Sequence, residues 1–234
     1  MRITAISDIH GDLPNIDSTD LLLICGDWSP LHIQCKFWSM CTWLREVFIP
    51  YLSSIQAQKI IFIAGNHDFI CDPYFTNFPY VDFVRDILNP LLRKHNILSK
   101  VKYLQKSYTI FNNYRIYGCP YVEGCRGWAF SQADFKNVYS RITKCDILIT
   151  HQPPVYNGIA RTQINNVWYE LGSYFLLEVV QKKKPMLLFC GHIHGGDHSK
   201  QILTHIDSTY TTMYNVSMKD ENYNMVFPPT VIEI

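Results

Sequence analysis

The chain begins with MRITAISDIHG, residues 1–11, and the order of residues in this stretch decides how the rest is interpreted. Ile3–Ile6 is a short apolar run, and it ends abruptly in Ser7-Asp8-Ile9-His10. Short runs of this kind predict strands that are buried on both faces. Asp8 and His10 stand two residues apart, so on an extended chain their side chains point to the same side.

The same pattern, an apolar run followed by polar residues, recurs four times along the chain. The runs and the residues after them are Leu21–Cys25 before Gly26-Asp27, Ile60–Ala64 before Gly65-Asn66-His67-Asp68, Ile147–Thr150 before His151, and Met186–Cys190 before Gly191-His192-Ile193-His194. Sites are commonly built where the strands of a sheet end. We therefore expect these polar residues to form one site.

Helices and further strands are expected between and after these runs. The helices are expected at Gln34–Leu52, which should stop near Pro50, at Tyr80–His95 and at Trp168–Lys183. The further strands are expected in a hairpin of Tyr108–Phe111 and Tyr114–Gly118 that turns at Asn112-Asn113, and at Val231–Ile234. The pattern predicts a single α/β domain over residues 1–234, with two mixed sheets packed face to face and flanked by helices.

The composition limits the functions that the chain can have. Its 234 residues include 21 Lys and Arg against 20 Asp and Glu, so its net charge of +1 gives no strong nucleic-acid or membrane signal. No apolar run approaches the ~20 residues that span a bilayer, and the N-terminus lacks the pattern of a signal peptide. We therefore expect a cytoplasmic protein whose 8 cysteines are reduced and mostly buried.

The polar residues after the five strands supply oxygen and nitrogen donors and no thiolate. They are Asp8, His10, Asp27, Asn66, His151, His192 and His194. Mixed imidazole and carboxylate ligation suits Mn, Fe, Zn, Co or Ni better than Cu(I), and we favour manganese. Seven donors exceed the four that one zinc ion usually takes, so they indicate two divalent ions that share a bridging carboxylate.

The motifs also stand in a familiar order. Asp8-x-His10, Gly26-Asp27, Gly65-Asn66-His67-Asp68, His151 and Gly191-His192-x-His194 together resemble the calcineurin-like metallophosphoesterase superfamily from residue 1 to about residue 196. A closer resemblance, to the MPPED branch, is visible at Tyr114–Pro120, Gly127-Trp128-x-Phe130 and Asp146–Pro154. That branch is similar to class III cyclic-nucleotide phosphodiesterases. Some of its members carry glycine where this chain has His192.

The resemblance implies a four-layer α/β/β/α sandwich with a dinuclear metal centre. One metal would take Asp8, His10, Asp27 and His194, and the other would take Asp27, Asn66, His151 and His192. It further implies that a metal-bridging hydroxide attacks the phosphate ester. Asn66 and His67 would be the catalytic residues, with His67 protonating the leaving oxygen.

One motif departs from the pattern of the serine/threonine phosphatases in this superfamily. Those enzymes carry GDxxDRG, whose second Asp orients the acidic histidine, whereas this chain reads GDWSPLH at residues 26–32. A phosphoprotein phosphatase is therefore disfavoured, and the partner of His67 stays open. As candidate substrate-binding residues, Arg126 could hold a phosphate and Trp128 could stack on a base. Alternatively, Arg126 is a surface charge and Trp128 anchors the core.

Three functions compete at this point. The near-neutral charge favours a phosphodiesterase, or a monoesterase, that acts on a small nucleotide-type substrate. A metal-dependent nuclease of the DNA-repair type shares the same motifs but should show a basic groove or an added DNA-binding domain. A non-catalytic metal-binding scaffold is disfavoured, because a sheet built only for binding would not need His10, His151, His192 and His194 together.

Overall fold

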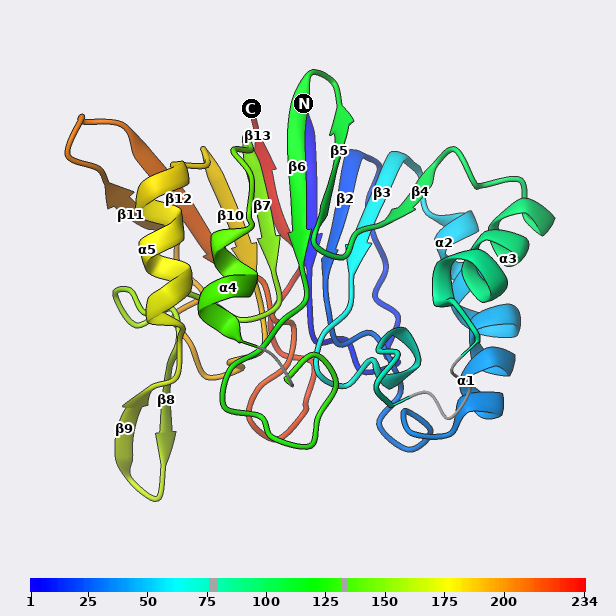
Figure 1. Cartoon of the computed structure of the whole chain (residues 1–234). Helices are drawn as coiled ribbons and strands as arrows, with labels where there is room; N and C mark the ends of the chain where they lie inside the picture. The colour runs from blue at the N-terminus through cyan, green and yellow to red at the C-terminus, as the bar shows by residue number, and fades with distance from the viewer. Residues whose placement is uncertain (76–79, 132–133) are drawn as a thin grey trace.

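Two β-sheets lie face to face between helical layers in the computed structural model, which describes residues 1–75, 80–131 and 134–234 (Figure 1). The first sheet has the strand order β13-β1-β2-β3-β4 and the second the order β11-β12-β10-β7-β6-β5, while β8 and β9 form a separate hairpin. The predicted architecture of two mixed sheets flanked by helices is confirmed.

The strands of the first sheet are β1 (Arg2–Ile6), β2 (Thr19–Cys25), β3 (Ala57–Ile63), β4 (Val101–Tyr103) and β13 (Thr230–Glu233). Those of the second are β5 (Ser107–Phe111), β6 (Tyr114–Cys119), β7 (Ile147–Thr150), β10 (Leu187–Cys190), β11 (Gln201–Thr204) and β12 (Tyr210–Asn215).

The central strands of each sheet run parallel, so their carboxyl ends meet at one edge. In the first sheet Ile3 of β1 stands opposite Leu21 of β2, and Leu22 of β2 stands opposite Ile60 of β3. In the second sheet β6, β7 and β10 are parallel in the same way. The polar residues that follow five of these strands are thereby brought to the same end of the molecule.

The prediction that the strands are buried on both faces is confirmed, as β2 illustrates. Leu21, Leu23 and Cys25 belong to the apolar cluster between the two sheets. Leu22 and Ile24 alternate with them and belong to the cluster under the helices of the first sheet. Burying each such leucine or isoleucine contributes about 1.5–3 kcal/mol, and the two clusters hold the strand ends in place.

Two helical segments that pack against the first sheet each contain a proline and continue past it. The segment Gln34–Leu52 folds as α1 (Phe37–Trp43), a π-helical turn (Leu44–Phe48) and α2 (Ile49–Ser54), so the prediction of a stop near Pro50 is wrong. The backbone N–H of Ile49 bonds the carbonyl of Leu44, five residues back. A wider turn of this kind leaves room for the proline ring, which would clash with a normal α-helical turn.

The second of these helices repeats the arrangement. The expected helix Tyr80–His95 begins with a π-helical turn (Phe83–Leu88) and continues as α3 (Asn89–Lys94), which has Pro90 in its first turn. A short 3₁₀ turn (Phe69–Cys71) precedes it. Among the described residues, no helix combines the length and the apolar character needed to cross a membrane.

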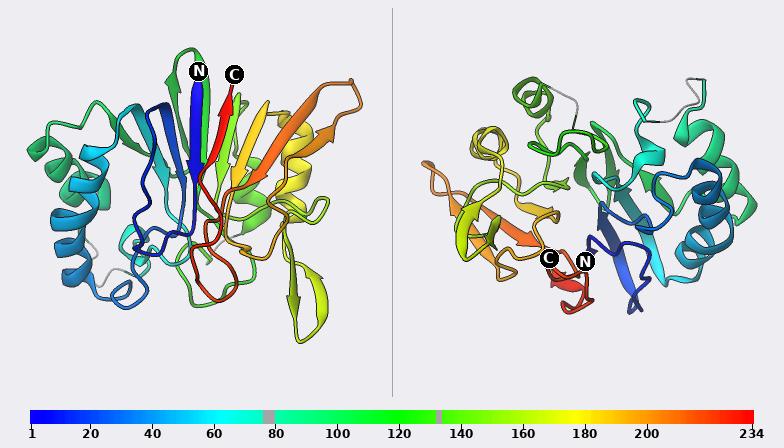
Figure 2. Two further views of the ribbon diagram at one scale, coloured as in Figure 1. Left: turned by 180° about the vertical axis from the view of Figure 1, so that it is seen from behind. Right: turned by 90° about the horizontal axis from the view of Figure 1, so that it is seen from below.

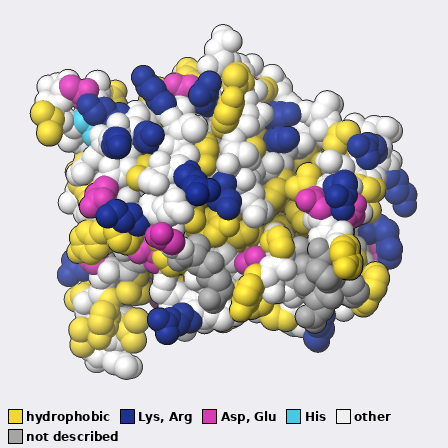
Figure 3. Space-filling view, in the orientation of Figure 1, with side chains coloured by type: hydrophobic (Ala, Val, Ile, Leu, Met, Phe, Trp, Pro, Cys, Tyr) yellow, Lys and Arg dark blue, Asp and Glu magenta, His cyan; other side chains and the backbone are white. Residues whose placement is uncertain are grey.

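The prediction of a helix over Trp168–Lys183 is wrong for the first residues of that range. Residues Val167–Glu170 form β9, which pairs with β8 (Arg161–Ile164), and the helix α5 is limited to Tyr174–Lys183. The turn between the strands, Asn165-Asn166, has positive φ angles of 51° and 63°, as a tight hairpin turn requires. The hairpin extends away from the sheets in Figure 1, and hydrophobic side chains gather over it in Figure 3.

The second sheet is covered on its outer face by α4 (Phe135–Ser140) and α5 (Figure 1). The Asn112-Asn113 hairpin of β5 and β6 is confirmed. The predicted last strand is confirmed as well, because β13 pairs with β1 in antiparallel register and brings the two chain ends side by side (Figure 2).

Candidate metal centre

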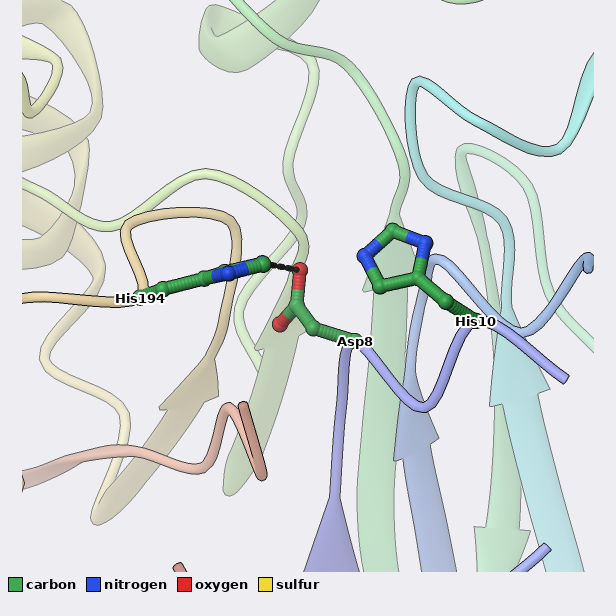
Figure 4. A group of neighbouring side chains, drawn as sticks. All are labelled: Asp8, His10 and His194. Carbon is green, nitrogen blue, oxygen red and sulfur yellow. Dashed lines mark ion pairs between the residues drawn. The ribbon is translucent and has the colours of Figure 1, made fainter. Parts of the chain in front are cut away.

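The loops after β1, β2, β3, β7 and β10 bring their donor side chains together. Ligand atoms of Asp8, His10 and His194 all lie within 4.8 Å of one another, and so do those of Asp27, His151 and His192. In Figure 4 the carboxylate of Asp8 reaches toward the ring of His194, with the ring of His10 on its other side. All seven side chains that the sequence pointed to are thus gathered in one place, Asn66 included.

Four distances describe how closely the donors approach. His194 Nε2 lies 3.4 Å from Asp8 Oδ1, and His151 Nε2 lies 3.2 Å from Asp27 Oδ2. Asn66 Oδ1 is 3.1 Å from His151 Nε2, and His10 Nε2 is 3.9 Å from Asp27 Oδ2. Asp27 therefore stands between the two groups, with His10 on one side and His151 on the other.

The backbone under these residues is not extended, contrary to the expectation for Asp8 and His10. The φ angles of Asp8, His10, Asp27 and His192 are 56°, 45°, 53° and 69°, in the left-handed region. Non-glycine residues adopt this conformation at a cost of about 1–2 kcal/mol each, and strained positions of this kind cluster at functional sites. The side chains still converge, because the loops curl around the site.

Glycine precedes three of the donors, Asp27, Asn66 and His192, because there is no room for a side chain. A Cβ atom on Gly65 would lie 2.3 Å from Asp27 Oδ1, and one on Gly191 would lie 2.2 Å from Asp8 Oδ2. Both distances are far below van der Waals contact. The glycines in the Gly65-Asn66 and Gly191-His192 motifs therefore let these loops pass directly beneath the carboxylates.

The hydrogen bonds around the histidines leave their inner nitrogens available. His151 Nδ1 is 2.8 Å from the carbonyl of Cys25 and His194 Nδ1 is 2.9 Å from that of Asp220, which directs both Nε2 atoms into the site. His10 is 6% exposed, and both of its ring nitrogens are buried without a hydrogen-bond partner. A buried imidazole without a partner is costly unless a metal ion completes its bonding, so the residues present fit two divalent ions.

The electrostatics of the site keep both carboxylates ionised. Burial favours a higher pKa at Asp8, but the hydrogen bond to His194 and the charge of His151 outweigh it and lower the pKa. Burial acts in the same direction at Asp27, and there the charges of His151 and His67 lower the pKa. Both side chains are therefore negatively charged at neutral pH and ready to hold cations.

The histidines divide into two pairs. Burial lowers the pKa of His10 to about 4 and that of His192 to about 3, so both rings are neutral at pH 7. Burial also opposes protonation of His151 and His194, but the carboxylates of Asp27 and Asp8 respectively outweigh it and raise their pKa to about 9. Bound metal ions must therefore displace protons from the second pair.

Asp68 ties two of the loops together, a role that its place in the Gly65–Asp68 motif did not reveal. Its carboxylate accepts hydrogen bonds from the backbone N–H groups of Gly65 at 2.7 Å, Asp27 at 2.8 Å and Ser29 at 2.9 Å. Burial and the charge of Asp27 raise its pKa to about 7. Asp68 thus positions Asp27 without itself being a donor to the metal centre.

His67 faces the same site and has a partner that the sequence left open. Its Nδ1 lies 2.7 Å from Gln34 Oε1, and its backbone N–H donates to Asp27 Oδ1 at 2.8 Å. Its Nε2 lies 3.9 Å from Asp27 Oδ2, and burial lowers its pKa. Gln34 is thus the partner of His67 that the sequence left open.

Residues 1–196 match the calcineurin-like phosphoesterase family. The chain belongs to this family. It is 30% identical over 247 aligned residues to metallophosphoesterase domain-containing protein 1 of Homo sapiens, covering 100% of this chain and 71% of that protein, and the Mus musculus protein of the same name matches equally.

Solved structures show the same fold at low sequence identity. The protein TT1561 of Thermus thermophilus superposes with a TM-score of 0.58 and 14% identity, covering 93% of this chain and 90% of that one. Phosphopantetheinyl hydrolase from Mycobacterium tuberculosis gives a TM-score of 0.51 and 13% identity, covering 94% and 90%. The family and the grouped donors together support a metal-dependent phosphoesterase.

The two residues expected to bind substrate, Arg126 and Trp128, lie in one loop, which runs beside the grouped donor side chains. The ring of Trp128 is centred 4.5 Å from that of His67, and the neighbouring Ala129 N–H bonds the carbonyl of Asn66 at 3.2 Å. In the same loop Cys125 Sγ lies 3.7 Å from His192 Nε2. Trp128 therefore borders the site, whereas Arg126 is exposed to solvent on the loop.

The family match ends at residue 196, yet a later residue also borders the site. The ring of Tyr223 is centred 5.0 Å from that of His10, 5.1 Å from that of His194 and 6.5 Å from that of His67. Sequence reasoning missed it, because no motif or strand end in residues 216–229 pointed to the site. Only the path of the chain between β12 and β13 brings it there.

Proposed function

We propose that the protein is a phosphohydrolase that uses two divalent ions to cleave a phosphodiester, or a monoester, of small nucleotide type. The observation that carries this proposal is the position of Asp27 between two groups of buried donors. A carboxylate in that position suits a pair of metal ions better than a single one. Membership of the calcineurin-like phosphoesterase family supports the reaction class.

The donors divide into two sets that share Asp27. We assign Asp8, His10, Asp27 and His194 to one ion and Asp27, Asn66, His151 and His192 to the other. When bound, the ions would supply an activated water and positive charge opposite the phosphate. Two ionised carboxylates leave a pair of divalent ions with excess positive charge, which favours an anionic ester.

His67 and its neighbours carry the proton chemistry in this proposal. Gln34 Oε1 accepts the Nδ1 proton of His67, so the imidazolium form of His67 would deliver its second proton, on Nε2, to the leaving oxygen and become neutral. Asn66 orients the phosphate from the adjacent position in the same loop. Trp128 beside His67 and the exposed Arg126 are the residues that we propose to contact the rest of the substrate.

The test begins with metal content and a substrate panel in Mn²⁺. The panel contains an aryl phosphodiester, an aryl monoester, 2′,3′- and 3′,5′-cyclic nucleotides, and single-stranded DNA. We expect bound metal and hydrolysis of small esters. Activity on DNA alone would favour a nuclease, and a protein that binds metal without hydrolysing any substrate would be a scaffold.

Asp27→Asn is the variant that tests the shared carboxylate. Because Asp27 belongs to both donor groups, the variant should lose affinity for both ions together and lose activity by at least about 100-fold. Metal analysis after dialysis measures the first effect. Retention of both ions in a folded Asp27→Asn protein would contradict the assignment, and Asp20→Asn, at a surface position remote from the centre, is the control.

A further inference from the structure

The loop that carries Tyr223 is fastened to the metal centre at several points. The N–H of Met218 bonds the carbonyl of Ser7 at 3.0 Å, and the carbonyl of Asp220 is 2.9 Å from His194 Nδ1. Lys219, buried at 4% exposure, extends its Nζ to Asp12 and to the carbonyl of Tyr223 at 3.0 Å. These bonds join the loop to the segments after β1 and β10.

This fastening holds Tyr223 in an unfavourable backbone conformation. Its φ angle is 62°, in the left-handed region that a bulky residue rarely occupies. Strain of this kind persists only where surrounding contacts hold the backbone in place, and it is found most often at functional positions. Tyr223 as a residue is 40% exposed although its ring meets the two buried histidines His10 and His194.

Trp128 also borders His67, and it lies in a different loop that reaches the same end of the molecule. Figure 1 shows the loop after β6 (green) and the loop before β13 (red) at this end, and the view from below in Figure 2 separates them to either side of the strand ends. The ring of His67 has Trp128 at 4.5 Å and Tyr223 at 6.5 Å between ring centres. Two aromatic rings thus border the histidine that we assign to the leaving oxygen.

We propose that Tyr223 is a specificity-determining residue that forms, with Trp128, an aromatic pair holding a planar group of the substrate beside the phosphate. This inference rests on the proposed function, because the group next to the leaving oxygen must pass beside His67. Aromatic faces favour aryl groups and nucleobases over alkyl groups, since stacking adds to apolar burial. The pair therefore selects among phosphate esters, while the metal centre holds the phosphate common to all of them.

The test measures binding of two non-hydrolysable probes, phenylphosphonate and methylphosphonate, to the Mn²⁺-loaded protein by calorimetry. Wild type should bind phenylphosphonate about tenfold or more tightly than methylphosphonate. Tyr223→Ala should reduce this preference to about threefold or less while leaving methylphosphonate affinity and metal content unchanged. Tyr223→Phe should keep the preference, because the ring and not the hydroxyl makes the contact.

The controls separate the inference from the function on which it rests. Tyr210→Ala removes an exposed tyrosine of β12 that does not border the site, and it should change nothing. If Tyr223→Ala does not fold, Tyr223→Leu replaces it, since leucine keeps the bulk without the flat ring. Equal affinity for both probes in wild type, or an unchanged preference in Tyr223→Ala or Tyr223→Leu, overturns the aromatic pair alone. A loss in Tyr223→Phe as large as in Tyr223→Ala overturns it too. Failure of both probes to bind overturns the inference together with the proposed function.

Discussion

His67 is held in place by three neighbours that come from different parts of the chain. Gln34 accepts at its Nδ1, Asp27 accepts from its backbone N–H, and Trp128 packs against its ring. The hydrogen bond to Gln34 keeps a proton on Nδ1, the ring nitrogen that faces away from the metal centre. In the protonated form of His67, which carries a proton on each ring nitrogen, the proton available for transfer is therefore the one on Nε2.

Gln34→Ala tests this arrangement. Without the acceptor, the ring of His67 loses its fixed tautomer and orientation, so we expect kcat to fall about tenfold with metal content unchanged. Gln34→Glu keeps an acceptor and adds a negative charge, which should raise the pKa of His67 and shift the alkaline limb of the pH–rate profile upward. Steady-state kinetics across pH measure both effects. A pH–rate profile of Gln34→Ala identical to that of the wild type would contradict this role of Gln34.

The opposite pKa shifts of the site histidines predict how the metal-free protein responds to pH. Below about pH 6.5, His10 and His192 bind fewer protons in the folded than in the unfolded chain, so stability falls on acidification toward pH 3–4. Between about 6.5 and 9, His151 and His194 bind more protons in the folded chain, so stability falls as the pH rises through this range. The free energy of unfolding should therefore peak near neutral pH.

Urea unfolding of the chelator-treated protein at pH 5, 7 and 9 measures this dependence. The lowered pKa of Asp8 and Asp27 adds to the loss of stability in acid. The raised pKa of Asp68, about 7, partly opposes the gain in stability between about pH 4 and pH 7. Excess Mn²⁺ should weaken the alkaline limb, because bound ions replace the protons on His151 and His194. A stability that rises steadily from pH 5 to pH 9 would contradict the prediction.

At the scale of elements, paired asparagines make two of the hairpins. Asn112-Asn113 joins β5 to β6 and Asn165-Asn166 joins β8 to β9, all four residues having positive φ. The first pair predicts its hairpin correctly. The second pair gave no such prediction, and the expected helix Trp168–Lys183 overlaps β9, the strand that follows this pair. The turn decides the outcome, since a two-residue turn with positive φ at both positions commits the flanking residues to pair as strands.

The end of α5 offers a test of helix termination. Lys184 closes the helix at φ 53°, a conformation that glycine adopts without strain. Lys184→Gly should relieve about 1–2 kcal/mol of strain and lose about 0.4–1 kcal/mol through greater freedom of the unfolded chain, a net gain of roughly 0.5–1 kcal/mol. Its ion pair with Asp207 is at the surface and contributes little.

Lys182→Gly is the matched control for this substitution. Lys182 lies inside α5, where glycine costs about 1 kcal/mol, so this variant should be destabilised. Urea unfolding of both variants measures the difference. Equal destabilisation by the two substitutions would show that the left-handed conformation of Lys184 carries no strain.

At the scale of the whole molecule, β13 closes the first sheet and joins the two ends of the chain. It pairs with β1, the strand that leads directly into Asp8, and Ile232 packs against the apolar cluster between the sheets. Removing residues 229–234 should lower the free energy of unfolding by about 2–3 kcal/mol, because it uncovers an edge and an isoleucine. Urea unfolding measures this loss.

Two point variants show where the contribution of β13 comes from. Ile232→Ala should account for much of the loss, whereas Val231→Ala, on the more exposed face of the strand, should change stability by less than about 0.5 kcal/mol. Metal content should stay unchanged in both, since neither residue reaches the centre. A truncated chain as stable as the full one would contradict this view of β13.

Local signals in the sequence account for the architecture and for the residues that gather at one end of it. The five apolar runs, each buried on both faces, are local signals, and the parallel pairing of their strands brings their polar ends to one edge. That is why the two sheets and the grouping of Asp8 through His194 could be foreseen, while the family was expected from the resemblance of the ordered motifs. No knowledge of distant contacts was needed for any of them.

The tertiary structure alone decided what surrounds these residues. Gln34 meets His67, Asp68 bonds Asp27 and Ser29, and Tyr223 meets His10 through contacts between segments far apart in the chain. Such contacts leave no periodic pattern, because each depends on where a loop lands and not on the residues beside it. The left-handed backbone at the donor positions has the same origin, since the folded chain compensates a strain that no short segment would adopt.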